Sequence, residues 1–201
     1  PLPRDDDAAY FAGDTRRLVV RQAKNNTAAA LTTGQTMTMQ VWVRSGVLPL
    51  KVTMVFHDAP GAITTAFAPV NDLDLAVVNA EGTAYLGNDF ADGVSTVGGT
   101  SDAINNVEQV LVPNPAPGVY TVQISAPAVN VGQQGYGLVV TGDVLDRCPA
   151  DFNGDGFVTG DDYDAYAQVF GSGDAAADMD GDGFVTSDDF DVYVVAFVAG
   201  C

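Results

Sequence analysis

The stretch Asp151-Phe-Asn-Gly-Asp-Gly-Phe-Val-Thr-Gly-Asp-Asp162 decides how the end of the chain folds, because it occurs twice. The second copy, Asp178-Met-Asp-Gly-Asp-Gly-Phe-Val-Thr-Ser-Asp-Asp189, begins 27 residues later. Both copies place an oxygen-bearing side chain at positions 1, 3, 5, 9 and 12, and a glycine at position 6, where the chain must turn sharply. This is the spacing of a twelve-residue calcium loop, in which position 7 contributes its main-chain carbonyl.

Each copy is therefore predicted to bind one calcium ion through oxygen atoms. The ligands predicted in the first loop are Asp151, Asn153, Asp155, Phe157, Thr159 and Asp162, and those in the second are Asp178, Asp180, Asp182, Phe184, Thr186 and Asp189. A solvated acidic turn is the other interpretation of an Asp- and Gly-rich segment. It is disfavoured because the two segments agree at every ligand position and at one fixed offset.

An amphipathic helix is predicted after each loop. Aromatic and apolar residues recur there with helical spacing, at Tyr163, Tyr166, Ala167 and Phe170 and again at Phe190, Tyr193, Val194 and Phe197. No such stretch precedes either loop, because residues 146–150 are few and include a proline, and residues 171–177 form a Gly-Ser-Gly connection. The repeated unit is thus a loop followed by one helix.

This duplicated loop-helix unit resembles a type I dockerin, over residues 148–201. The opening Cys148-Pro-Ala-Asp-Phe-Asn-Gly-Asp-Gly and the Gly200-Cys201 end are similar to GC-type dockerins, which are found at the C-termini of exported bacterial proteins. The resemblance implies a small α-helical domain with two calcium ions that docks or retains the protein at the cell surface.

The chain has two cysteines, Cys148 and Cys201, which frame this region. In an exported protein an even count favours a disulfide, and an approximate twofold relation between the two halves can bring the start and end of the unit together. The alternatives are attachment of Cys201 to a cell-surface partner or lipid, and two free thiols without a role.

The charge is strongly acidic and unevenly distributed. The formal net charge is -18, and residues 148–201 carry twelve Asp and no Lys or Arg. A chain this acidic is a poor candidate for binding nucleic acid or an anionic membrane surface. No apolar run is long enough to form a transmembrane helix. The chain begins at Pro1 without an initiator Met or a signal peptide, so we interpret it as a piece of a longer protein that is secreted or displayed at the cell surface.

The preceding part of the chain predicts an antiparallel β-sandwich or jelly roll. Residues 1–16 are a polar leading segment. Short alternating runs follow, separated by Gly, Pro, Asn and Asp, at residues 18–22, 35–44, 50–57, 72–79, 83–86, 107–112, 120–125 and 136–141. No helical pattern interrupts them. We therefore predict a mainly β domain over residues 1–144 and the calcium-binding domain over residues 145–201, joined by a very short linker.

The β region resembles the C-terminal jelly-roll domain of secreted subtilisin-like serine proteases, over about residues 17–142. The matching segments are Met54-Val-Phe-His-Asp-Ala-Pro60, Val70-Asn-Asp-Leu-Asp-Leu75, Tyr85-Leu-Gly-Asn-Asp-Phe90, Asn105-Asn-Val-Glu-Gln-Val110, Gly118-Val-Tyr-Thr-Val122 and Asn130-Val-Gly-Gln-Gln134. In that family the domain follows the catalytic domain and binds calcium. The resemblance implies that an upstream protease catalytic domain is a partner of this chain.

A third calcium site is expected in the sandwich. In an alternating strand Leu73 and Leu75 face the core, which sends the carboxylates of Asp72 and Asp74 to the other face, towards acidic loops. By family resemblance the expected ligands are Asp74, Asp89 and Asp102, with Asn105 or Asn106 supplying an amide oxygen. A solvated acidic rim is the alternative.

No catalytic residue is predicted in this chain. Its only histidine is His57, in a predicted strand end, and no serine lies in a G-x-S-x-G context. We therefore expect a non-catalytic, calcium-binding C-terminal region that stabilises an exported subtilisin-like serine endopeptidase and docks or anchors it at the cell surface. The alternative is a free-standing adhesive or carbohydrate-binding protein, although the only tryptophan, Trp42, lies in an alternating apolar run that favours the core.

Overall fold

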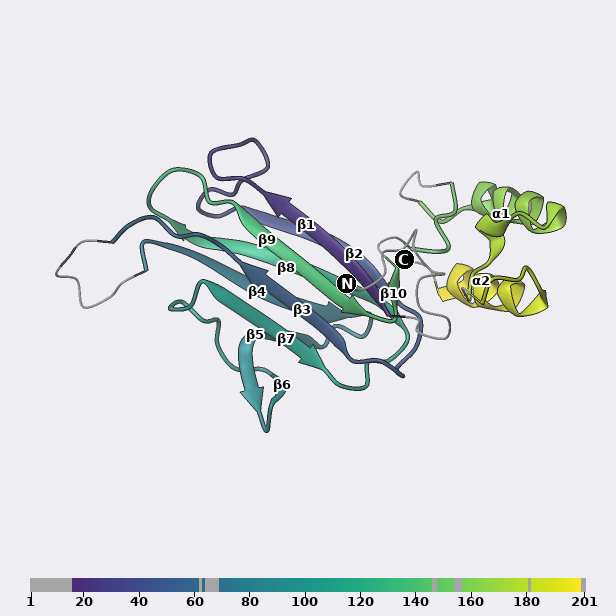
Figure 1. Cartoon of the computed structure of the whole chain (residues 1–201), viewed down its shortest axis with the longest axis horizontal. Helices are drawn as coiled ribbons and strands as arrows, with labels where there is room; N and C mark the ends of the chain where they lie inside the picture. Colours follow the sequence, from purple (N-terminus) through teal and green to yellow (C-terminus); the bar gives the residue numbers. More distant parts are fainter. Residues whose placement is uncertain are drawn as a thin grey trace.

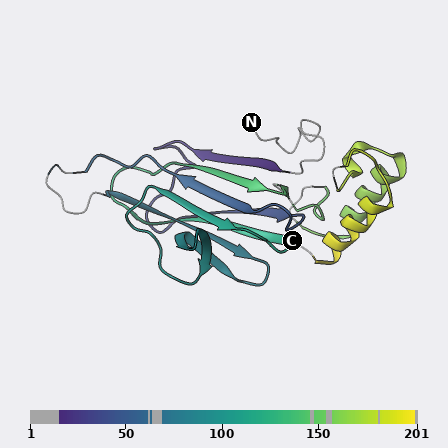
Figure 2. The ribbon, with the colours of Figure 1, turned by 60° about the horizontal axis from the view of Figure 1, so that its bottom comes forward.

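The computed structural model describes residues 16–61, 63, 69–145, 148–153, 157–180 and 182–199. This part of the chain is mainly β. Its ten strands form two antiparallel sheets that face each other as a sandwich, and its two α-helices lie together at one end of the sandwich (Figure 1). The turned view in Figure 2 shows the helices at the same end.

The strands are β1 (Arg17–Ala23), β2 (Thr36–Val43), β3 (Leu50–Val55), β4 (Asn71–Asn79), β5 (Ala84–Ala91), β6 (Val94–Val97), β7 (Val107–Val112), β8 (Gly118–Val129), β9 (Tyr136–Gly142) and β10 (Val144–Leu145). One sheet has the order β1-β9-β3-β7 and the other the order β10-β2-β8-β4-β5-β6. Strands that follow one another in the chain therefore often lie in different sheets.

The core of the sandwich follows from the alternation of side chains along each strand. In β4, Leu73 and Leu75 are buried, whereas Asp72 and Asp74 are partly exposed. Burial alternates in the same way along β9 of the facing sheet, where Leu138 is fully buried. Because alternate residues of a strand point to opposite faces, apolar residues at every second position are enough to fill the space between the sheets.

The eight predicted strands are all present, with some different ends. The strand predicted over residues 50–57 ends at Val55, so His57 lies beyond it, where its carbonyl accepts a hydrogen bond from the Gln134 amide. Strands β5 and β8 are longer than predicted. Strands β6 and β10 were not predicted, and β10 spans the predicted domain boundary while pairing with Trp42 and Val43 of β2.

The helices are α1 (Gly160–Ser172) and α2 (Ser187–Ala199), with a 3-10 turn, η2 (Ala175–Ala177), before the second loop. Each α-helix starts inside one of the duplicated stretches. Thr159 caps α1, and Gly173 ends it in the left-handed conformation, with φ of 69°. Among the described residues no helix combines the length and the apolar character needed to cross a membrane.

The two helices are held together by aromatic side chains. The rings of Tyr166 and Tyr193 stack with centroids 3.9 Å apart and planes 10° apart, and both residues are fully buried. Phe152 contacts the Tyr166 ring edge-on at 5.4 Å, and Phe170 lies 5.6 Å from Phe190. These residues come from the predicted helical stripes, with Phe152 added from the first loop. Burial of aromatic rings is the main apolar contribution in so small a unit.

The end of the sandwich and the helical tail share a small apolar cluster. Trp42 of β2 packs with Cys148 and Ala150, which follow β10, and with Ala196 of α2. Trp42 is 7% exposed. Its ring therefore joins the two parts of the molecule and is not presented to solvent as a flat surface for a sugar.

Candidate metal sites

The second duplicated stretch gathers three carboxylates. Ligand oxygens of Asp178, Asp180 and Asp182 lie within 4.8 Å of one another. The loop turns back on itself because the Asp178 carboxylate accepts hydrogen bonds from the amides of Asp182, at 3.2 Å, and Gly183, at 2.9 Å. Gly183 has a φ of 91°, which explains why glycine stands at this position.

The last aspartate of the loop, Asp189, holds the two sides of the loop together. Its side chain is fully buried. Oδ1 accepts the amides of Met179, at 2.6 Å, and Asp180, at 3.1 Å, while Oδ2 accepts the amide of Thr186, at 2.7 Å. A carboxylate oxygen has two lone pairs, so Oδ2 retains capacity for a cation.

The first loop repeats this arrangement. Asp162 is also fully buried. Its Oδ1 accepts the amide of Asn153 at 3.1 Å, and its Oδ2 accepts the amide of Thr159 at 2.8 Å. Asp155 lies outside the described residues, so the structure describes five of the six predicted ligands of this loop. Asp162 and Asp189 accept hydrogen bonds from equivalent main-chain amides, so the sequence repeat is also a repeat of hydrogen bonds.

The carboxylates of the loops repel one another in the absence of a cation. Burial raises the pKa of Asp180, and the charges of Asp189, Asp182 and Asp178 raise it further. For Asp162, burial acts in the same direction, but hydrogen bonds from Thr159, Asn153 and Phe152 outweigh it and lower the pKa. Crowded, ionised oxygens with fixed main-chain geometry fit a hard divalent cation such as calcium.

Each helix also contributes a tyrosine next to the other loop. Burial, followed by the charge of Asp189, raises the pKa of Tyr166 to about 12. Burial, followed by the charge of Asp162, raises the pKa of Tyr193 to about 12. Because Tyr166 is in α1 and Asp189 in the second loop, while Tyr193 is in α2 and Asp162 in the first, the stacked rings connect the two loops through the core of the tail.

In the sandwich, the three predicted ligands have different surroundings. Asp102 already accepts four hydrogen bonds, from the side chains of Asn88, at 2.7 Å, and Asn105, at 2.6 Å, and from two main-chain amides. Asp89 packs against Gly99, where a Cβ atom would not fit. Asp74 has a buried oxygen, Oδ1, without a hydrogen-bond partner. Among the three, Asp74 therefore has the clearest capacity for a cation.

The structure adds Glu108, which sequence analysis did not select. Glu108 is on β7, is fully buried and directs Oε2 to the amide of Leu75 at 2.8 Å. Its other oxygen, Oε1, is buried without a hydrogen-bond partner. A buried carboxylate with an unmatched oxygen is costly unless a proton or a cation neutralises it.

The separation of β4 from β5 explains the position of Glu108. These strands pair only from Ala76 to Val78 of β4, so the amide of Leu75 has no partner on β5. The carboxylate of Glu108 replaces that partner. Gly87 of β5 makes room for it, since a Cβ at this position would collide with the Glu108 side chain. The one signal in the sequence is that Glu108 occupies a core-facing position of β7, two residues before the buried Val110.

The acids around Glu108 influence one another. Burial, then the charges of Asp74, Asp102 and Asp72, raise the pKa of Glu108 to about 8 against the opposing hydrogen bond from Leu75. Burial, then the charges of Asp74, Asp102 and Asp58, raise the pKa of Asp72 to about 6. In the described part of the sandwich, no three ligand atoms lie within 4.8 Å of one another. A cation there would have to draw these carboxylates together.

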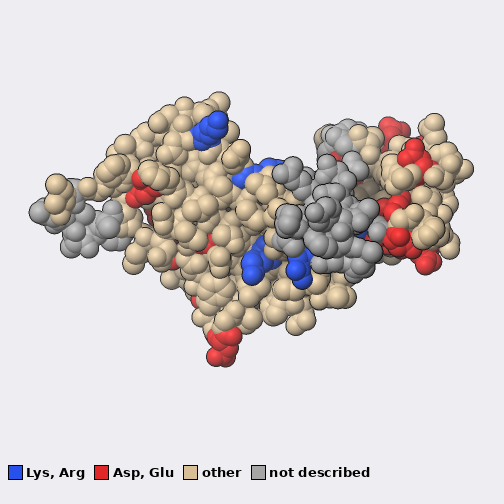
Figure 3. Space-filling model, in the orientation of Figure 1, with Lys and Arg blue, Asp and Glu red and all other residues tan. Residues whose placement is uncertain are grey.

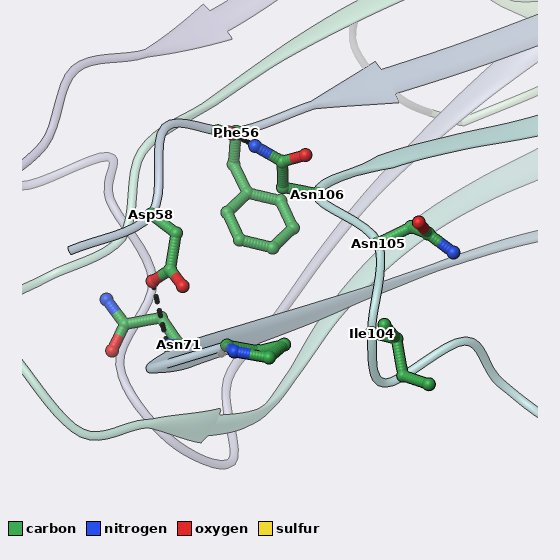
Figure 4. Close-up of a pocket in the computed structure, with 7 residues that line it drawn as sticks. Phe56, Asp58, Asn71, Ile104, Asn105 and Asn106 are labelled. Atoms are coloured by element: carbon green, nitrogen blue, oxygen red, sulfur yellow. Dashed lines mark hydrogen bonds between the residues drawn. The ribbon is translucent and has the colours of Figure 1, made fainter. Parts of the chain in front are cut away.

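A hollow of about 330 Å³ adjoins these acids at the end of the sandwich away from the helices. Figure 4 shows the Phe56 ring pointing into it, with Asp58 and Asn71 on one side and Ile104 on the other. Asp58 accepts the amides of Val70, at 2.7 Å, and Asn71, at 2.8 Å. These bonds tie the segment after β3 to the start of β4 at the Asp58 side of the hollow.

The basic side chains are confined to one part of the molecule, whereas acidic side chains occur on both. Figure 3 shows acidic side chains gathered over the helical tail, whereas the visible Lys and Arg side chains lie over the sandwich. This matches the sequence, in which all eight Lys and Arg residues precede residue 148.

Comparison with known proteins gives a partial relationship. No protein-family model matches the chain. It is 31% identical over 94 residues to the "Serine protease/ABC transporter B family protein tagA" of Dictyostelium discoideum, which covers 45% of this chain and 5% of that protein. The chain therefore spans a small fraction of that relative's length, and the relationship links part of it to a protein named as a serine protease.

Two solved structures show distant likeness. A protein from Sulfurospirillum deleyianum has 11% identity and a TM-score of 0.31, covering 61% of this chain and 96% of its own. The P-domain of Penaeus vannamei nodavirus has 13% identity and a TM-score of 0.25, covering 61% of this chain and 94% of its own. Neither likeness is close enough to assign a fold or a function.

Glu108 predicts an unusual pH dependence in calcium-free buffer. The pKa of this residue is about 8 in the folded protein, against an ordinary value of 4.5 for a glutamate, so the folded state holds a proton that the unfolded state lacks between these pH values. Stability should therefore be highest below pH 4.5 for this group and fall as pH rises towards about 8, by roughly 1.4 kcal/mol per pH unit in the middle of the window.

Glu108→Gln should remove the part of the decline that Glu108 causes, which is most of the decline above about pH 6, giving a protein that is more stable than the wild type at pH 8 in chelator. The only other glutamate, Glu81, is exposed in the turn after β4, so Glu81→Gln is the matched control and should leave the decline unchanged. Urea unfolding from pH 5 to 8 measures the effect. Equal pH profiles for Glu108→Gln and the wild type would contradict it.

Proposed function

We propose that this chain is the non-catalytic, calcium-binding C-terminal region of an exported subtilisin-like serine protease, which stabilises the protease and docks it at the cell surface. The observation that carries the proposal is the second loop, where Asp178, Asp180 and Asp182 meet within 4.8 Å. Its buried Asp189 holds the loop amides in the same way as Asp162 does in the first loop. Two such loops are the expected form of a duplicated calcium module.

The arrangement of the tail supports a dockerin-like domain. Each loop leads directly into one helix, and the helices pack through the stacked rings of Tyr166 and Tyr193. The loops would hold two calcium ions through the residues predicted from their spacing. Calcium would supply the positive charge that the crowded carboxylates lack.

The strand order supports a jelly roll. The order β1-β9-β3-β7 faces β2-β8-β4-β5, with β6 and β10 added at the edges of the second sheet. In a jelly roll eight strands form two four-stranded sheets from two Greek keys. The topology therefore agrees with the subtilisin-like resemblance, and the relationship to the protein named as a serine protease supports the same origin.

A further calcium ion is proposed in the sandwich, close to Asp74 and Glu108. Both residues have a buried oxygen without a hydrogen-bond partner, and Asp72 lies near enough to influence both. Asp102 and Asp89 remain part of the acidic surroundings of this site. The free-standing carbohydrate-binding alternative has less support, because Trp42 is buried at the junction with the tail.

Calcium should stabilise the chain through both loops. At a calcium concentration near 1,000 times the Kd, binding to one site adds about 4 kcal/mol. The double variant Asp155→Asn with Asp182→Asn changes position 5 of each loop and should lose most of the rise in Tm that calcium gives. Asp164→Asn with Asp191→Asn alters equivalent exposed helix positions and removes the same charge.

Scanning calorimetry in calcium and in chelator compares these variants. A wild-type Tm that does not respond to calcium would refute the calcium proposal. An equal loss of response in both double variants would mean that net charge, and not the loop ligands, sets the effect.

The protease origin is tested on the gene and on the parent protein. The coding region upstream of Pro1 should encode Asp, His and Ser motifs of a subtilisin-like catalytic domain. The parent protease should lose activity faster at elevated temperature when residues 1–201 are deleted, and the difference should shrink in chelator. An upstream region without these motifs would sink the proposal.

A disulfide between Cys148 and Cys201 is also proposed. Cys148 is buried beside Trp42, and Cys201 lies outside the described residues. Closing a loop of about 54 residues would stabilise the fold by roughly 4 kcal/mol in the chain-entropy model. Intact mass of the secreted protein should show no iodoacetamide uptake before reduction and two modified thiols after it. Two thiols modified without reduction would rule the disulfide out.

A further inference from the structure

One side chain of the sandwich contacts the main chain of the second loop directly. Arg44 follows β2, and its Nη1 donates to the carbonyl oxygen of Asp180 at 3.0 Å. Its Nε donates to Oδ1 of Asp143 at 2.9 Å, and its Nη2 lies 2.6 Å from the same oxygen. The guanidinium thus connects the turn between β9 and β10 to the second loop. Arg44 and Asp180 are 136 residues apart in sequence.

The position of Arg44 is fixed from several sides. The Arg44 and Asp143 side chains are 9% and 6% exposed. The amide of Arg44 donates to the carbonyl of Asp143 at 2.9 Å, and the Ser45 hydroxyl holds the second oxygen of Asp143 at 2.5 Å. A planar guanidinium held at Nε and Nη2 cannot turn without breaking these bonds, so Nη1 has a defined direction.

Asp180 is the residue of the loop where this contact has the greatest effect. Its amide donates to Asp189, its carbonyl accepts from Arg44, and its side chain belongs to the three carboxylates that meet. The main chain of Asp180 is therefore held at both ends. One of these main-chain bonds, to Asp189, comes from within the tail, and the other, from Arg44, comes from the sandwich. Together they hold the Asp180 carboxylate close to those of Asp178 and Asp182.

The same junction contains Trp42, two residues before Arg44. Trp42 packs against Ala196 of α2 and against Cys148 and Ala150. Because Trp42 is the only tryptophan in the chain, its fluorescence reports on this junction alone. Trp42, whose fluorescence would be followed, and Arg44, which makes the contact with the loop, therefore both lie at the end of β2.

We infer that Arg44 is a positioning residue for the second calcium loop, so that calcium in this loop and packing of the tail on Trp42 stabilise each other. This inference rests on the proposed calcium binding. The bond from Arg44 to the Asp180 carbonyl holds the main chain in the arrangement in which the three carboxylates lie together. Repulsion among these carboxylates opposes that arrangement, and a bound cation would relieve the repulsion. Calcium binding and the Arg44 contact therefore favour the same arrangement, and the coupling acts equally in both directions.

The charge of Arg44 alone would have the opposite effect. A cation near a calcium loop lowers calcium affinity by repulsion, so removal of Arg44 by electrostatics alone would strengthen binding. The pairing with Asp143 offsets this charge. Weaker calcium binding after the removal of Arg44 is therefore diagnostic of positioning.

The test is a calcium titration of the full chain followed by Trp42 emission and its quenching by acrylamide, with calorimetry in parallel. In the wild type, calcium should reduce quenching of Trp42. Arg44→Met should raise the calcium concentration at half-change at least about fivefold. Arg44→Lys should give an intermediate value, because an ammonium keeps the charge but cannot hold Asp143 and Asp180 with a planar fork.

Arg21→Met is the matched control. Arg21 is exposed on β1, where its guanidinium donates to the carbonyl of Val20, and the change alters the net charge equally. It should leave the midpoint unchanged. If Arg44→Met does not fold, Arg44→Lys and the wild-type quenching data still decide the question.

The outcomes separate the two proposals. A wild-type chain that shows neither a heat of binding nor a rise in Tm with calcium refutes calcium binding itself. A chain that binds calcium with the same midpoint in Arg44→Met or Arg44→Lys as in the wild type overturns the role of Arg44 alone. Calcium binding to the second loop without any change in Trp42 quenching also overturns the coupling.

Discussion

The tail depends on one buried carboxylate at the end of each duplicated stretch. Asp162 and Asp189 close their loops by accepting hydrogen bonds from main-chain amides at equivalent loop positions, at nearly equal distances. Each also lies in the first turn of its helix. A negative charge there is favoured by the helix dipole. The same residue thus starts a helix and fixes the loop before it, so the loop and the helix cannot form independently.

The acidic side chains of the sandwich are arranged differently from those of the tail. Its acids do not come from one local stretch but from β4, β7 and the loop before β7, and the early separation of β5 from β4 leaves room for the Glu108 side chain between the strands. Glu108 fills the resulting gap and supplies the acceptor that Leu75 lacks. The tail brings three carboxylates together within one loop, whereas the sandwich buries a single carboxylate that requires a proton or a cation to neutralise it.

Local patterns predicted much of this structure. The alternation in residues 107–112 and the stripe through Tyr166 are visible in sequence because each reports one buried face. Strands β6 and β10 were missed because four and two residues are too few to show alternation. Glu108 and Arg44 were missed because their roles come from tertiary contacts, across 33 residues to Leu75 and 136 residues to Asp180, which leave no periodic signal. The calcium ions and the disulfide stay predictions.

The pairing of β10 with β2 has a mechanical consequence. When the tail and the sandwich are pulled apart, tension enters the sheet at its edge through Val144 and Leu145. Two paired residues at an edge strand would peel apart bond by bond under such a force. Arg44 runs parallel to this route and joins the end of β2 directly to the second loop. Part of the load therefore bypasses the weakest strand of the sheet and is carried by a guanidinium.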